Sequence, residues 1–199
     1  MKTPKLDQVV LRQPVSTGDL SDINAVIEEA IASWPTSPRL KRLAMAPLQY
    51  RGVDLQDFEF LLCYKAHACL GVAAWQPSVP MVLQQTSVAQ TDGEAGNVNA
   101  VLLHGLFVSA QAQGRGIGGL LLDELTCRVR REKFSSIQVR VERFSTSYFE
   151  QRGFRLLTHE EEPGFQPTSY PYRYVLDLDP SQERDSMVIN KTGALKLSG

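Results

Sequence analysis

Cysteine is scarce in this sequence, and its placement suits neither a metal site nor a set of disulfides. The three cysteines, Cys63, Cys69 and Cys127, are an odd number and lack the spacing of zinc ligands. We therefore expect reduced, mostly structural thiols, with Cys127 buried inside a helix, and no bound metal.

Long apolar runs and an excess of one charge are also missing. No stretch reaches the roughly 18 apolar residues of a membrane span, and the start, MKTPKLDQVV, lacks the apolar run of a signal peptide. The 21 lysines and arginines nearly balance 22 aspartates and glutamates, which gives a net charge of −1. Nothing here suggests general affinity for nucleic acid or an anionic membrane. The sequence predicts a cytoplasmic protein with neither as a partner.

What the chain does have is the composition and periodicity of one α/β domain. Its 199 residues are 43% hydrophobic, enough for a sizeable core. Apolar residues at helical spacing predict helices over 23–34 and 117–129, and a short helix before Gly153. The stretch 35–52 is ambiguous and suits a second short helix. Alternating or continuous apolar runs predict strands over 9–15, 58–65, 69–75, 98–108, 135–142 and 172–178. This order mixes hairpins with crossovers, so we expect a mixed sheet.

A glycine-rich stretch, QGRGIGGLLLDEL over 113–125, opens the second of these helices. Glycine lets the backbone take positive φ and expose its N–H groups, and a helix N-terminus carries about half a positive charge. Together they favour an anion such as a phosphate.

Two common phosphate-binding motifs fit this stretch poorly. A P-loop needs a lysine after its spacer, and that lysine is missing. Gly114, Gly116 and Gly119 do satisfy the dinucleotide pattern G-x-G-x-x-G, and Glu142 follows about 20 residues later. However, the residues SAQAQ separate Val108 from the first glycine, which in that fold directly follows the strand.

Two motifs resemble those of the GCN5-related N-acetyltransferase (GNAT) family. LFVSAQAQGRGIGGLLLDEL is similar to its acyl-CoA-binding motif, Gln/Arg-x-x-Gly-x-Gly/Ala, with Gln113, Gly116 and Gly118 in place. YFEQRGF is similar to its second motif, and the two occur in the expected order. The resemblance implies a GNAT-like single domain over 5–179, with a central, twisted mixed sheet and helices on both faces. The polar C-terminal tail, 180–199, falls outside it.

The resemblance also implies acetyl-CoA as the acyl donor, with no metal. In the family, backbone N–H groups of the glycine turn bind the pyrophosphate, and the strand before it binds pantetheine where it splays from its parallel neighbour. The corresponding turn residues here are Gln113, Gly114, Arg115, Gly116, Ile117, Gly118 and Gly119. The corresponding strand residues are Leu106, Phe107 and Val108.

Direct attack of an amine on the thioester requires a proton acceptor for the amine and favours a proton donor for the thiolate. His104, on the strand before the glycine turn, is the candidate base, with a core histidine as the alternative. Tyr148 is the candidate acid, although many family members carry the tyrosine at the position of Phe149. Neighbouring helix positions point about 100° apart, so only one of the two aromatic rings can reach the sulfur. Glu142 is nearest to the position where the family often has asparagine, and it is either a second candidate base or an exposed charge at the end of the strand.

The sequence thus predicts an N-acetyltransferase that transfers acetyl from acetyl-CoA to a primary amine of a small molecule or peptide. A non-catalytic acyl-CoA-binding module is the alternative, and a dinucleotide-binding domain ranks third. The acceptor depends on loops at 35–52, 76–96 and 158–171, and a homodimer is compatible with the sequence.

Overall fold

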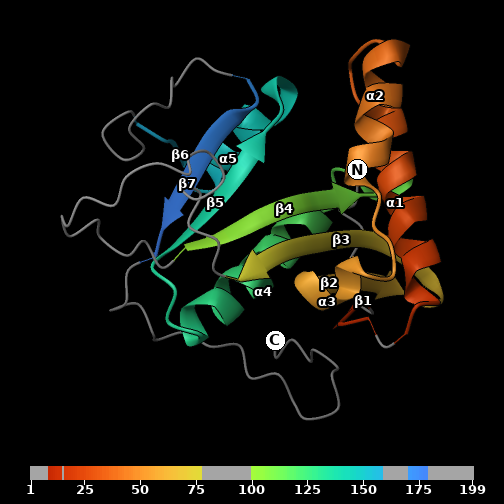
Figure 1. Ribbon diagram of the computed structural model, residues 1–199, viewed down its shortest axis with the longest axis horizontal. Coiled ribbons are helices and arrows are strands. Elements are labelled where there is room, and N and C mark those ends of the chain that lie inside the picture. The colour runs from red at the N-terminus through yellow and green to blue at the C-terminus, as the bar shows by residue number, and fades with distance from the viewer. Residues whose placement is uncertain (1–8, 15, 78–99, 159–169, 179–199) are drawn as a thin grey trace. The chain divides into compact units, whose positions relative to one another are not determined.

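The computed structural model describes residues 9–14, 16–77, 100–158 and 170–178 (Figure 1). The strands are β1 (Val9–Arg12), β2 (Glu59–Lys65), β3 (Ala68–Pro77), β4 (Ala100–Val108), β5 (Ser136–Val141), β6 (Arg155–Leu156) and β7 (Tyr172–Asp177). The helices are α1 (Asp19–Ser33), α2 (Pro38–Leu48), α3 (Asp54–Asp57), α4 (Ile117–Arg131) and α5 (Thr146–Gln151), with 3₁₀ turns η2 (Ala110–Ala112) and η3 (Arg143–Ser145).

The strands form one sheet in the order β1-β2-β3-β4-β5-β7-β6. β4 and β5 pair in parallel, whereas β1 with β2, β2 with β3, and β7 with both β5 and β6 pair antiparallel. The expected α/β fold with a mixed sheet is therefore confirmed. The short helix α3 was not expected, because four residues are too few to show a helical period.

The chain divides into two compact units that share β4. The described part of the first unit comprises 9–14, 16–75 and 105–127, and that of the second comprises 76–77, 100–104, 128–158 and 170–178. The single domain expected over 5–179 stays a prediction, and the tail over 180–199 lies outside the described residues.

The core of the first unit forms between α1 and the β2–β3 hairpin. The apolar positions of α1 recur at helical spacing, so Ile23, Ile27 and Ile31 lie on one face and are fully buried. They pack in one cluster with side chains of β2 and β3 and with Phe107 at the end of β4. This cluster fixes the strand end that precedes the glycine turn.

In the second unit, α5 packs against one face of β7. The Tyr174 hydroxyl donates to Glu150 Oε1 at 2.7 Å, and a Cβ on Gly153 would lie 3.6 Å from the Leu176 side chain. Gly153 follows the C-cap residue of α5 with φ +83°, which confirms the expected glycine stop. Tyr174 and Leu176 alternate with Arg173 and so occupy the opposite face of β7 from it.

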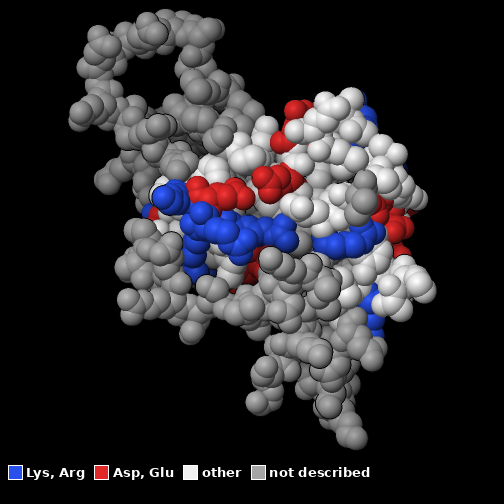
Figure 2. Space-filling view, turned by 90° about the horizontal axis from the view of Figure 1, so that it is seen from below, with Lys and Arg blue, Asp and Glu red and all other residues white. Residues whose placement is uncertain are grey.

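Burial corrects one expectation about cysteine. Cys63 is buried and Cys69 half-buried, but Cys127 is exposed, because it lies off the α4 face that buries Leu121, Leu125 and Val129. No helix within the described ranges is both long and apolar enough to cross a membrane. Figure 2 shows lysine and arginine side chains beside aspartate and glutamate on the face it presents, so neither sign holds that face alone.

Candidate functional site

The glycine turn that opens α4 has the backbone geometry of an anion site. Gly114 and Gly116 have φ of +72° and +83°, which only glycine adopts without strain. The first α4 hydrogen bond runs from Leu120 N to Gly116 O at 3.0 Å. The N–H groups of the first turn therefore lack carbonyl partners within the helix, and they point away from its N-terminus. A Cβ on Gly114 would meet no atom within 4 Å, so the turn leaves open space there.

Gln113 holds the turn in place through its side chain. Its Nε2 donates to Val108 O at 3.1 Å and to Ser33 Oγ at 2.9 Å, which links the end of β4 to the end of α1. The sequence placed Gln113 among the cofactor-binding residues. Because its side-chain amide is engaged with the protein, its own contribution to a ligand would come from the backbone.

The end of β4 extends beyond its pairing with β5. The parallel register comprises four pairs, from Ala100 with Ser136 to Leu103 with Val139, whereas β4 continues to Val108. The β4–β5 ladder therefore ends within β4, and the expected splaying of the two strands stays a prediction. Just beyond it, a Cβ on Gly105 would collide with the ring of Phe107, so glycine is required for this local packing.

Leu106 and Val108 are half-buried, and Phe107 is buried at 6% exposure in the core of the first unit. Directly after β4, Ser109 N donates to Leu70 O of β3 at 2.9 Å.

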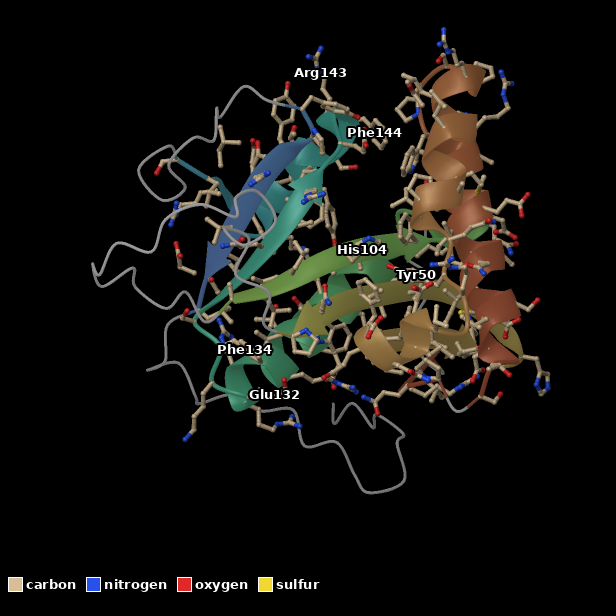
Figure 3. All side chains as sticks on the ribbon, in the orientation of Figure 1. Tyr50, His104, Glu132, Phe134, Arg143 and Phe144 are labelled. Carbon is tan, nitrogen blue, oxygen red and sulfur yellow. The ribbon has the colours of Figure 1, made fainter. Side chains whose placement is uncertain are left out.

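His104 is the last β4 residue of the second unit and is half-buried (Figure 3). Leu102 pairs with Gln138, and His104 and Arg140 each follow by two residues on their own strands, beyond the last recorded pair of Leu103 with Val139. Side chains at matching positions of parallel neighbours point to the same face. His104 and Arg140 thus share a face where the β4–β5 ladder ends.

The two aromatic residues of α5 have different surroundings. Phe149 is buried, and its ring packs edge to face on Phe154 at 5.2 Å between centroids. Tyr148 is half-buried with a buried hydroxyl oxygen, and the guanidinium carbon of Arg152 lies 5.8 Å from its ring centroid. Phe149 is thus a core residue, whereas Tyr148 carries an ionisable hydroxyl group.

Glu142 caps η3 directly after β5, and Ser145 N donates to its carbonyl at 2.8 Å. Burial raises the pKa of its carboxyl group above the ordinary value. The sequence reasoning missed Arg140 and Arg173, which pair directly across the β5–β7 ladder. The alternation of polar residues in QVRVE signals one common face, but the partner on β7 cannot be inferred from local sequence.

The catalytic candidates and the glycine turn fall into different units. The residues from Leu106 to Gly119 belong to the first unit, and His104, Glu142 and Tyr148 to the second. Among the described residues, no three histidines, cysteines, aspartates or glutamates gather as metal ligands would.

Comparisons with known proteins agree with this geometry. A family model described as an acetyltransferase (GNAT) domain matches residues 80–166. The search of curated proteins found no match. Among solved structures, the fold is similar to the PaiA N-acetyltransferase of Thermoplasma acidophilum in complex with coenzyme A, with 14% identity, a TM-score of 0.61, and coverage of 86% of this chain and 99% of that one.

Two further structures show the same likeness. A GNAT acetyltransferase of Brucella melitensis in complex with acetyl-CoA has 18% identity and a TM-score of 0.56, covering 87% of this chain and 90% of that one. A GNAT acetyltransferase of Staphylococcus aureus has 16% identity and a TM-score of 0.56, covering 86% and 99%. At these identities the likeness concerns the fold. Residues 80–166 thus match the model of a GNAT acetyltransferase domain, and the fold is similar to those of GNAT acetyltransferase structures.

Proposed function

We propose that the protein is an acetyl-CoA-dependent N-acetyltransferase that acts on a primary amine of a small molecule or peptide. The observation that carries this proposal is the turn before α4, where Gly114 and Gly116 have positive φ and a Cβ on Gly114 would meet no atom within 4 Å. Two of the solved structures with the same fold hold coenzyme A or acetyl-CoA, which supports the choice of donor.

The residues present fit this donor. The N–H groups of Ile117, Gly118 and Gly119 offer hydrogen bonds and a favourable dipole to the pyrophosphate. The part of β4 beyond Leu103 has no recorded pairing with β5, which leaves its backbone groups for the amide groups of pantetheine. Gln113 keeps the turn attached to α1 and β4 while the ligand binds.

In the reaction the amine nitrogen attacks the thioester carbonyl carbon, an amide bond forms, and the carbon–sulfur bond breaks. His104 accepts the proton that the amine loses, because an imidazole is a competent base near neutral pH. Tyr148 donates a proton to the departing thiolate. No covalent enzyme intermediate is needed.

Binding and turnover test this function together. Acetyl-CoA should stabilise the folded protein by about 2.7 kcal/mol at a hundredfold excess over its dissociation constant, whereas NADH and ATP should not. When a panel of amines is supplied with acetyl-CoA, the free thiol of coenzyme A should appear in proportion to the amide formed. Stabilisation by NADH alone would favour a dinucleotide site instead. Stabilisation by acetyl-CoA without turnover of any amine would favour a non-catalytic acyl-CoA-binding module.

A further inference from the structure

We infer that the outer face of α2 is a docking surface for a protein partner that presents an acidic amphipathic helix. This face, called the α2 surface below, consists of Arg39, Leu40, Arg42, Leu43 and Pro47, all of which are exposed. The inference goes beyond the proposed function, because it concerns the binding of a second protein and does not depend on acetyl transfer.

Two leucines of the α2 surface lie in solvent. Leu40 and Leu43 are 54% and 61% exposed. They are three residues apart and are therefore neighbours on one face of the helix, with Pro47 one turn further along the same face. A single exposed leucine is ordinary, whereas a row of apolar side chains along one helix face is typical of a face that packs against a partner.

The inner face of α2 is already in use within the first unit. Met45 and Leu48 are half-buried and pack against the core between α1 and the β2–β3 hairpin. Lys41 Nζ donates to Ala32 O at 2.6 Å and so attaches the same side of α2 to the end of α1. At 100° per residue, these three positions lie on the side of the helix opposite to the exposed leucines. The outer face is therefore the one that a partner can reach.

The row of side chains next to the leucines is basic. Arg39 and Arg42 are exposed, and each precedes one of the leucines, so they form the neighbouring row on the helix surface. The sequence has no aspartate or glutamate from residue 33 to residue 53. An apolar row beside a basic row is complemented by a helix with an apolar row beside an acidic one, because carboxylates then lie opposite the guanidinium groups.

Charge also decides between this partner and a second copy of the chain. A twofold interface places the same surface opposite itself, so the arginines of the two copies would face each other and repel. An anionic membrane would match the charge of the α2 surface. However, α2 has no aromatic residue, and interfacial helices usually anchor through aromatic side chains together with leucines. An acidic protein helix therefore fits the surface best.

The test uses the full-length chain and two synthetic peptides. Both peptides carry leucines at helical spacing, and the flanking positions are glutamate in one and glutamine in the other. Anisotropy of a fluorescent label on each peptide measures the affinity. The wild-type protein should bind the glutamate peptide about fivefold or more tightly than the glutamine peptide. This preference should disappear at about 1 M salt, where the Debye length is about 3 Å.

Two double variants test the two rows separately. Leu40→Gln with Leu43→Gln should weaken binding of the glutamate peptide by about tenfold or more, because the apolar contact is lost. Arg39→Gln with Arg42→Gln should abolish the preference for the glutamate peptide. All four side chains are exposed, so the melting temperatures should stay close to that of the wild type.

Matched controls remove the same kinds of group elsewhere. Lys65→Gln with Arg131→Gln removes two exposed positive charges outside α2, and Val10→Thr removes apolar surface from a β1 residue that is 41% exposed. Both controls should retain the wild-type affinity and the preference for the glutamate peptide.

Three results would overturn the inference. The first is equal binding of the two peptides by the wild type, or unchanged binding by the leucine variant. The second is binding to phosphatidylglycerol vesicles that the leucine variant loses, while neither peptide binds, which would assign the surface to a membrane. The third is a concentration-dependent dimer that the leucine variant abolishes, again without peptide binding. Since acetyl-CoA takes no part in these measurements, failure of the proposed function is distinguished from failure of this inference.

Discussion

Gly118 occupies a helix position where an acidic side chain would stabilise the helix but weaken the binding of acetyl-CoA. It lies in the first turn of α4, where an acidic side chain complements the helix dipole and typically stabilises by about 0.3–1 kcal/mol. Gly118→Asp should therefore keep or raise the melting temperature, yet weaken acetyl-CoA binding strongly, because it puts a negative charge beside the pyrophosphate. Gly118→Asn has the same size without the charge and should bind acetyl-CoA better than the aspartate variant. Equal affinity in these two variants would contradict a phosphate site.

His104 offers a test of proton transfer. His104→Ala should leave acetyl-CoA affinity nearly intact and lower turnover by about a hundredfold or more, the usual contribution of a positioned base. The loss should shrink as pH rises, because more of the amine is already deprotonated. A pH–rate profile with a melting curve checks this. A lower melting temperature with unchanged turnover per folded molecule would instead make His104 a core residue.

Glu142 should make stability depend on pH. Its pKa is raised by burial, so the folded protein holds the proton more tightly than the unfolded chain does. The stabilisation from this group is complete at acidic pH and is lost as pH rises through the raised pKa. Glu142→Gln should thus melt at a higher temperature than wild type near neutral pH, and the difference should vanish at about pH 4. If the melting temperatures of the variant and the wild type differ equally at both pH values, the raised pKa of Glu142 is not the cause.

At the scale of elements, β3 and α4 approach each other closely at one glycine. A Cβ on Gly71 would lie 2.9 Å from Leu121 Cδ1, 3.0 Å from Ile117 Cγ2 and 3.1 Å from Phe107 O. Gly71→Ala should destabilise the protein by about 1–3 kcal/mol through overpacking. Gly52→Ala is the control, since a Cβ there meets nothing within 4 Å. Denaturant melts of both variants measure the difference, and equal midpoints would contradict the close approach.

The elements themselves were predicted well where a long apolar period exists, and less well elsewhere. The period of α1 and the glycines before α4 are local signals, and both elements appear within a few residues of the expected bounds. The pairing of Arg140 with Arg173 joins residues 33 positions apart in a register that no local pattern records. The burial of Cys127 was also misjudged, because Cys127 lies off the apolar α4 face that buries Leu121, Leu125 and Val129.

At the scale of the whole molecule, the sequence predicted the fold class but not the strand order. The motifs around Gly116 and Gly153 are local and point to the family whose model matches residues 80–166, whereas the insertion of β7 between β5 and β6 depends on long-range pairing. The glycine turn of the candidate site was predicted because its signal is a short local motif. The face that carries Arg140 and Arg173 was not predicted, since it depends on pairing between β5 and β7, which are far apart in the sequence.

The hydrogen bond from Gln113 to Ser33 bears on whether the segment with the acyl-CoA motif can fold by itself. Ser33 lies 80 residues before Gln113, and Phe107 packs with α1 residues that lie about as far upstream. The segment that the family model matches, 80–166, contains neither partner. Expressed alone or grafted into a foreign host, this segment should fail to give a cooperative melt, and it should regain one when co-expressed with residues 1–79. The motif is local in the sequence, but its conformation depends on contacts with the N-terminal part of the chain.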